Sequence, residues 1–319
     1  MTVALVVVAV AFALVNGANT GATLLATSLS LTTISHPLGL VMLAAGVVGG
    51  PLLVGSAVAT TFATKMTPAG SGSELAMLTS VLVTLAVVLG LTRWGIPTGL
   101  TLALVGALAG YAAVSDGAVA WSSISTVLAM MALAPVVGGV ISFVIVSVVA
   151  RRLRSRHAGR SLGRLHVWVF PLLALGYGAS DGQKMLAIAA VALGTAGPAG
   201  VSVPLVVLVG LGLLFGLGSA LGLRSMTRRV GRGVLPVRPL YAVTSETATS
   251  VALLASAGVG APVGVAQTLT GSLVGAGGSQ GWGRVRWGQV GTIVVAWSVT
   301  LPLAFGLAAT AGLITGRMI

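Results

Sequence analysis

Long apolar segments follow one another along almost the whole chain. About ten of them are long enough, or nearly so, for a helix that crosses the ~30 Å hydrocarbon layer of a bilayer. They lie near 2 to 30, 37 to 62, 73 to 92, 97 to 113, 123 to 150, 166 to 195, 199 to 223, 241 to 257, 261 to 278 and 289 to 314. Only 7% of the residues are charged, against roughly a quarter in soluble domains. We therefore predict an all-α polytopic membrane protein embedded in the lipid bilayer.

Basic residues concentrate in short connections between these segments. Residues 151–164 contain six Arg and residues 224–238 contain five, and neither stretch contains an acid. Because Lys and Arg are retained on the cytoplasmic side, we predict that both connections are cytoplasmic. Counting segments from them puts both termini outside, in a multi-pass protein of the cell (plasma) membrane. Topology thus explains the net charge of +13, and we expect no nucleic-acid partner.

Two motifs occur twice, in the same order and at nearly the same spacing. Residues 17–21 (GANTG) resemble 178–182 (GASDG), and 95–110 resemble 260–275 in a Gly-x-Pro turn and the glycines after it. Each copy holds five segments, so the second copy enters the membrane from the opposite side, as in inverted-repeat transporters. We predict a first repeat at 1–150, a basic cytoplasmic linker at 151–165 and a second repeat at 166–319.

Small and polar residues interrupt the apolar pattern near 16–30 and 176–184. Gly and Asn disfavour helix continuation, and unwound backbone inside a bilayer needs protein or water around it. Free amides at such a break attract anions. Close helix packing is the better explanation of the lone glycines, but not of the polar cluster. The predicted anion site comprises the backbone of Gly17, Ala18, Gly178 and Ala179 and the side chains of Asn19, Thr20, Thr23, Ser180, Asp181, Gln183 and Lys184.

Lys184 is the least expected of these residues. A charge near the bilayer centre costs from about 2.5 to more than 10 kcal/mol, so it is rarely kept without a partner. Asp181 lies three residues earlier, on the same helix face. Either Lys184 meets the anion directly and supplies positive charge, or the two residues form a neutral structural pair.

The acidic residues are candidates for binding the coupling ion, whereas the histidines receive no catalytic or metal-binding role. Glu74, Glu246 and Asp181 are candidates for binding a coupling Na+ or relaying a proton. Ser73-Glu74 and Ser245-Glu246 equally resemble capped helix starts. The histidines at 36, 157 and 166 lack metal-ligand spacing, and we place them at the membrane interfaces. The chain has no Cys, and we expect no catalytic residue, no metal site and no bound cofactor.

The repeated motifs resemble those of the inorganic phosphate transporter (PiT) family. Each half of that family carries a signature close to Gly-Ala-Asn-Asp-x-Ala-Asn, matched here at 17–23 and 178–184. The resemblance extends to Glu74, to 245–248, to both Gly-x-Pro hairpins and to 296–302, which is nearly the whole chain. It implies an ion-coupled symporter, usually of phosphate with Na+ or H+, with a sulfate-carrying branch. Family members are often homodimers.

The chain also departs from the family pattern. Thr20 replaces the first signature Asp, Ser180 replaces an Asn, and Lys184 stands where an Asn is expected. The hairpins have lost most hydroxyl side chains and both His residues of the family's Pro-x-Ser-Thr-Thr-His. We keep Thr101 and Gln267, one from each hairpin, as candidate substrate-binding residues. These changes bear on the substrate and Na+ sites more than on the fold.

The favoured function is therefore ion-coupled symport of inorganic phosphate. Sulfate is the alternative within the class, because it stays fully deprotonated at neutral pH and suits a site with few carboxylates and an added Lys. A membrane enzyme would need convergent carboxylates, His or a metal motif, and we predict that the chain is not an enzyme. A non-transporting sensor or subunit is a third hypothesis, raised by the loss of the signature Asp at position 20.

Overall fold

The structure is a computed structural model. It describes residues 2–29, 31, 33–67, 73–94, 96, 98–115, 120–152, 158–197, 199–230 and 238–316. Side chains at the ends of some helices are also outside the described part: 29, 150–152, 158–160, 225–230 and 316.

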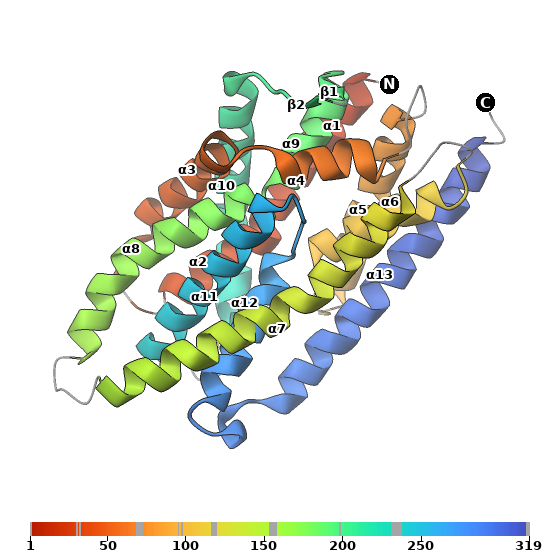
Figure 1. Cartoon of the computed structure of the whole chain (residues 1–319). Coiled ribbons are helices and arrows are strands. Elements are labelled where there is room, and N and C mark those ends of the chain that lie inside the picture. The colour runs from red at the N-terminus through yellow and green to blue at the C-terminus, as the bar shows by residue number, and fades with distance from the viewer. Residues whose placement is uncertain are drawn as a thin grey trace.

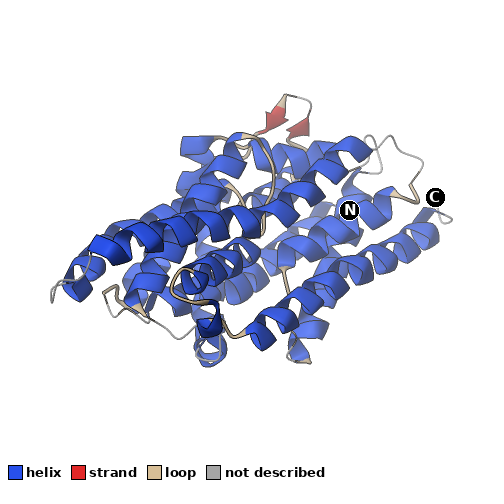
Figure 2. Cartoon of the chain, turned by 60° about the horizontal axis from the view of Figure 1, so that its bottom comes forward, coloured by secondary structure: helices blue, strands red, loops and turns tan. Residues whose placement is uncertain are grey.

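Helices account for nearly all of the described chain (Figures 1 and 2). In chain order the elements are α1 (Thr2–Asn16), the π-helical turn η1 (Gly17–Gly21), α2 (Ala22–Leu29), α3 (His36–Val54), α4 (Ala57–Thr60), the π-helical turn η2 (Thr61–Lys65), α5 (Ser73–Arg93), α6 (Leu100–Ala112), α7 (Trp121–Arg152), α8 (Ala158–Ala179), α9 (Gln183–Ala192), β1 (Ala196–Gly197), β2 (Gly200–Val201), α10 (Leu205–Val230), α11 (Pro239–Gly258), α12 (Val265–Gly278), the 3-10 turn η3 (Trp282–Arg284) and α13 (Trp287–Gly316).

Several helices are suited to lipid by length and by surface. Within the described residues, six helical stretches are long and apolar enough to cross a membrane. They expose large apolar side chains, including Val7, Leu53 and Leu221. In water such a surface would drive aggregation, whereas in lipid it needs no partner. The predicted all-α membrane fold is confirmed, while ten segments in two inverted repeats of five stay a prediction.

The chain ends and the basic connections lie at opposite ends of the bundle. The start of α1 and the end of α13 lie at the same end of the bundle as the short β1–β2 hairpin (Figure 1). The end of α7, the start of α8 and the η3 turn lie at the other end (Figure 1). The arrangement therefore separates the termini from Arg164 and Arg284.

Two predicted membrane segments are interrupted, one at an unexpected position and one at the predicted polar motif. The segment expected at 37–62 ends at Val54, because Gly55 takes a φ of +94° that a helix cannot contain. Beyond it, α4 and η2 lie across one end of the bundle next to α9 (Figure 1). The segment expected at 166–195 is divided between α8 and α9. The basic linker predicted at 151–165 overlaps both neighbouring helices, since α7 reaches Arg152 and α8 starts at Ala158.

The same kind of helix crossing occurs in both halves of the chain. A Cβ atom at Gly46 of α3 would lie 2.3 Å from the carbonyl oxygen of Ala174 in α8. A Cβ atom at Gly218 of α10 would lie 2.1 Å from the carbonyl oxygen of Leu14 in α1. Backbones approach this closely only where no side chain intervenes. Each motif-bearing helix therefore packs closely, through a glycine, against a helix of the other half of the chain: α8 against α3 and α1 against α10.

Candidate functional site

The second copy of the repeated motif forms a true helix interruption. Helix α8 ends at Ala179, a turn covers 180–182, and α9 starts at Gln183. The turn's amides are largely satisfied: Ser180 N donates to the carbonyl of Gly176 and Gly182 N to that of Tyr177, at 3.1 and 2.7 Å. These two amides are therefore already bonded within the turn. The predicted role of the Gly178 and Ala179 backbone in anion binding stays a prediction.

Lys184, Asp181 and Thr101 form a buried polar cluster at this interruption. The Nζ atom of Lys184 lies 2.7 Å from Asp181 Oδ1 and donates a hydrogen bond of 2.7 Å to Thr101 Oγ1. The Thr101 hydroxyl in turn donates to Asp181 Oδ1. All three side chains are buried, with Lys184 at 0% exposure. The cluster joins α9 and the turn before it to α6, from the other half of the chain.

Thr101 reaches the cluster because a helix starts beside it. The backbone at Gly99 is extended and α6 begins at Leu100, which sets Thr101 in the first turn. Nearby in sequence, Thr98 Oγ1 is buried without a hydrogen-bond partner among the described residues. In the second hairpin, Gln267 is 6% exposed and its Oε1 is also unpartnered. Buried polar atoms without a partner are rare and mark places where a ligand or water can bind.

Ser180 and Gln183 link the interruption to its neighbours. The Ser180 hydroxyl lies 3.0 Å from that of Ser256 in α11. Gln183 Oε1 accepts from Ala59 N at 2.8 Å, and its Nε2 donates to the carbonyl oxygens of Gly55 and Ala179. With all its polar atoms used, Gln183 holds the α3–α4 corner against α9. It has little capacity left for a substrate.

The first copy of the motif is not an interruption. The helix passes from α1 through the π-helical turn Gly17–Gly21 into α2, and Ala22 N donates to the carbonyl of Gly17. The expected break is absent because a π turn absorbs the motif within a continuous helix. A Cβ atom at Gly17 would lie 2.1 Å from the carbonyl oxygen of Phe215, so Gly17 serves close packing.

The candidate side chains of the first copy do not contact the Lys184 cluster directly in any contact that the structure describes. Asn19 and Thr23 are half-buried, Thr20 is buried, and the Thr23 hydroxyl donates to the carbonyl of Asn19. The two copies do meet one residue before each motif, where Asn16 Nδ2 donates to Tyr177 Oη at 2.7 Å. Both partners are fully buried. The motifs are therefore neighbours inside the bundle.

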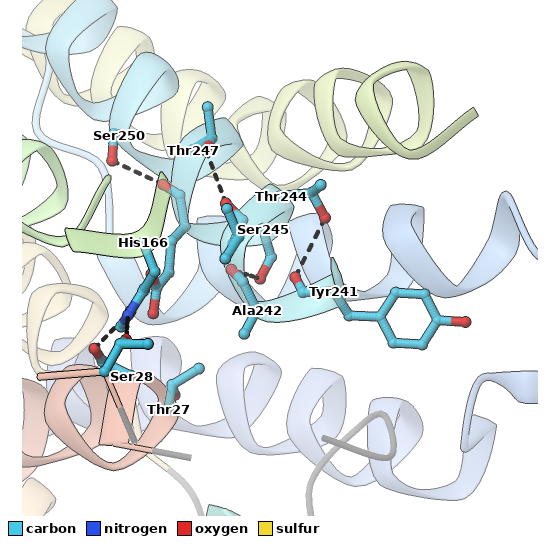
Figure 3. A network of polar contacts seen from close by, with 12 residues as sticks. Thr27, Ser28, His166, Tyr241, Ala242, Thr244, Ser245, Thr247 and Ser250 are labelled. Carbon is cyan, nitrogen blue, oxygen red and sulfur yellow. Dashed lines mark hydrogen bonds and ion pairs between the residues drawn. The ribbon is translucent and has the colours of Figure 1, made fainter. Parts of the chain in front are cut away.

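The two glutamates differ in their surroundings. Glu74 is half-buried in the first turn of α5, which agrees with a helix-start carboxylate. Glu246 is not at a helix start, because α11 begins at Pro239, and it is fully buried. It lies 3.1 Å from Nε2 of His166, also fully buried. His166 is buried inside the bundle, and Figure 3 shows its ring next to Ser28. Its depth relative to the membrane interface stays a prediction.

Several residues singled out in the sequence lie outside the described part of the chain. They are Gly95 and Pro97 of the first hairpin, His157, and residues 153–157 and 231–237 of the basic connections. Among the described residues, no three His, Cys, Asp or Glu side chains gather where they could hold a metal ion.

A small pocket lies between η2, the start of α7 and the turn after α11. Its volume is about 180 Å³, and its lining includes Thr61, Lys65, Ser122 and Thr126. The Thr61 hydroxyl donates to the carbonyl of Gly260 at 2.8 Å. Thr61 follows Ala59, whose amide binds Gln183, by half a helical turn. The α4–η2 segment therefore separates this pocket from the residues next to Lys184.

Comparison with known proteins identifies the family to which the chain belongs. The sequence profile of the phosphate transporter family matches the chain twice, over residues 16–171 and 155–308. The chain belongs to the phosphate transporter family. The predicted family resemblance is thereby confirmed, and so is the prediction that the chain is not an enzyme. Together with the six apolar helical stretches, membership indicates a multi-pass membrane protein.

Individual relatives agree with this assignment. A probable low-affinity inorganic phosphate transporter of Mycobacterium leprae is 30% identical over 229 residues, or 68% of this chain. The chain spans only 55% of that relative's length. A protein of the same description from Bacillus subtilis is 25% identical over 98% of this chain and 96% of its own. A solved structure described as the sodium-dependent phosphate transporter matches all of this chain with a TM-score of 0.84 at 18% identity, which shows a shared fold.

Proposed function

We propose that this protein is a secondary active transporter that carries inorganic phosphate across the cell membrane together with a coupling ion. The observation that carries the proposal is the buried Lys184 ammonium, which is held at the helix interruption by Asp181 and Thr101. Family membership supports the transport function, and the relatives' descriptions support phosphate as the substrate. The residues that follow are assigned by their chemistry.

Lys184 is the residue that meets the anion. An ammonium group has three N–H donors, and the contacts described for Lys184 use two of them. The third donor can bind a phosphate oxygen, in surroundings where a charge-assisted hydrogen bond is strong. Thr101 and Asp181 orient the ammonium. Thr98 Oγ1 and Gln267 Oε1, which have no hydrogen-bond partner among the described residues, are hairpin groups with capacity left for a ligand or a water.

The charge balance of the site calls for a coupling ion. Lys184 and Asp181 cancel one another, so a bound phosphate would add one or two uncompensated negative charges inside the bundle. Burying such a charge without a partner costs several kcal/mol. A cation that enters with the anion removes this cost. We propose Na+ or H+ for this role, with Glu246 and Asp181 as the carboxylates best placed to serve it; half-buried Glu74 is a weaker candidate.

Alternating access would follow from two inverted repeats, with both termini outside and the basic connections in the cytoplasm. The matched glycine crossings in the two halves and the two matches to the family profile support the repeats. The separation of the termini from the basic connections supports the orientation (Figure 1). A homodimer remains a prediction from the family resemblance.

A competition panel tests the substrate. Purified protein in liposomes should take up radiolabelled phosphate, and excess unlabelled phosphate or arsenate should compete because they share shape and charge. Sulfate should compete weakly. The panel is run with and without Na+ and at several pH values. Strong competition by sulfate alone would assign the protein to sulfate instead, and uptake no faster than in protein-free liposomes would favour a non-transporting role.

A further inference from the structure

A second buried polar cluster lies on α8 and α11, away from Lys184. His166 Nε2 lies 2.8 Å from the Ser28 hydroxyl and 3.1 Å from Glu246 Oε2, and its Nδ1 contacts the Thr33 hydroxyl. His166 and Glu246 are both 0% exposed, whereas Thr33 is exposed. The imidazole therefore bridges the exposed Thr33 hydroxyl and the buried Glu246 carboxylate; Figure 3 shows the ring next to Ser28.

Glu246 is poorly satisfied in this cluster. Neither of its carboxylate oxygens has a hydrogen-bond partner of good geometry among the described residues, although Oε2 is within ion-pair distance of His166. A buried carboxylate that lacks donors is unstable as an isolated anion. It needs either a proton of its own or an imidazolium beside it. In both cases the dry cluster holds one proton more than a neutral His and an ionised Glu.

We propose that His166 and Glu246 form the binding site for the proton that crosses the membrane with the anion. The inference rests on the proposed transport function and deepens it by naming the coupling ion and its site. A proton from water reaches Nδ1 of His166 by way of the Thr33 hydroxyl and binds to the imidazole or to Glu246. When the cluster is hydrated from the other side, that proton is released to water and the pair returns to neutral His and ionised Glu.

The donor set fits a proton better than Na+. Hard cations such as Na+ take several oxygen ligands around one point. Here the His166 Nε2 atom lies between the other two groups, 2.8 Å from the Ser28 hydroxyl and 3.1 Å from Glu246 Oε2. It occupies the position that a metal ion would need. A His whose two nitrogens contact different groups is suited to passing a proton from one to the other. The cluster therefore selects H+ by its geometry.

Two helices connect this cluster to the anion site. Helix α11 carries Glu246 and, about 15 Å further along at about 1.5 Å per residue, Ser256, which meets Ser180. Helix α8 carries His166 and ends at the interruption that contains Asp181. Because α8 and α11 pack against each other along this length, a movement that separates them opens both sites.

In the described part of the chain, the elements packed around the pair carry few other titratable groups. They are Arg164 and Tyr177 on α8, Tyr241 on α11 and His36 at the start of α3, while the side chain of Arg160 on α8 is outside the described part. Tyr177 is bonded to Asn16, and Tyr241 accepts from Arg284 at 3.4 Å. Arg151 and Arg152 of α7 lie outside the part of the chain whose side chains are described. His166 is the titratable group in direct contact with Glu246.

The test uses the full chain in Na+-free liposomes and inorganic phosphate as the probe. An outside-acid pH gradient should make the wild type accumulate phosphate, and an entrapped pH dye should report protons entering with it. Glu246→Gln should accumulate none above protein-free liposomes, yet should still exchange internal for external phosphate at equal pH. A neutral amide cannot take or release the proton but leaves the anion site intact.

A matched control lies one turn away. Ser250 is buried on α11 and its hydroxyl donates only to the carbonyl of Glu246 in the contacts described, so Ser250→Ala should keep both accumulation and exchange. The proposal is overturned if Glu246→Gln accumulates phosphate like the wild type, or if it loses exchange and accumulation together while remaining folded. Wild-type accumulation of phosphate without proton entry overturns it even if the variant does not fold. Absence of wild-type exchange would refute the transport function itself.

Discussion

In the proposed transport mechanism, Lys184 is the residue that binds the anion. Its ammonium is fully buried in a chain suited to lipid, and it is tolerated there because Asp181 neutralises it and Thr101 accepts a further hydrogen bond. Intramembrane ionisable residues are usually kept for function. If Lys184 and Asp181 only form a structural pair, replacing both with neutral residues should preserve uptake. If Lys184 binds the anion, the same replacement should abolish uptake.

Replacing the pair tests the role of Lys184. Lys184→Met keeps the length of the side chain but removes its charge, and it should reduce phosphate uptake to background. It also leaves Asp181 buried and unpaired, which should cost about 3–5 kcal/mol of stability. The double variant Asp181→Asn/Lys184→Met should regain thermal stability without regaining uptake. Recovery of uptake in the double variant would mean that the pair is structural.

The sequence identified some site residues and missed others for physical reasons. Asp181 and Lys184 could be found because charges in an apolar segment stand out, and their spacing puts them on one helix face. His166 was missed because its partners come from distant positions: Ser28 and Glu246 reach it only through tertiary packing. Ser245-Glu246 resembles a helix cap locally, but α11 starts earlier, at Pro239.

At the scale of elements, the two copies of the motif have diverged in structure. The first retains a continuous helix with a π turn at Gly17–Gly21, and the second breaks into α8 and α9. Composition predicts weakness at both places, since Gly and polar residues occur in each. Whether the helix breaks or widens depends on packing against α10 and α3, which local sequence does not encode.

The close packing of α3 against α8 can be tested by a Gly→Ala substitution, which adds one methyl group between the two backbones. A Cβ atom at Gly178 would lie 1.8 Å from the carbonyl oxygen of Gly46, so Gly178→Ala must push the two helices apart. Overpacking of this kind costs about 1–3 kcal/mol, and here it meets rigid backbone. We expect a clear fall in the melting temperature of the detergent-solubilised protein.

The matched control for that variant is Gly210→Ala in α10, where a Cβ atom would meet nothing within 4 Å. It should be neutral or slightly stabilising, because Ala favours helix by about 1 kcal/mol over Gly. Equal melting temperatures for the two variants would show that α3 and α8 are not in such close contact.

At the scale of the whole molecule, the membrane fold was the most predictable feature. Hydrocarbon thickness fixes the length of a spanning helix, so apolar runs reveal the class directly. The break at 180–182 was predicted from the polar residues at 176–184, whereas the end of α3 at Gly55 was not, because the apolar pattern continues through that position. The agreement with a solved transporter fold over the whole chain shows that the global arrangement tolerates extensive sequence change.

The absence of Cys from the chain makes its orientation easy to measure. Ala199→Cys places a thiol in the β1–β2 hairpin at the end that holds the termini, and Gly283→Cys places one in η3 at the other end. Because the basic connections should be cytoplasmic, an impermeant thiol reagent should label intact cells only at position 199. Labelling of position 283 in intact cells, with none at 199, would reverse the proposed orientation.

The most direct measurement is an experimental structure of the protein determined with phosphate bound. We predict density for the anion at the helix interruption, with an oxygen within hydrogen-bond distance of Lys184 Nζ and with Thr101 and Asp181 beside it. Phosphate bound elsewhere, with Lys184 and Asp181 still paired and no anion or water between them, would show that Lys184 does not bind the substrate.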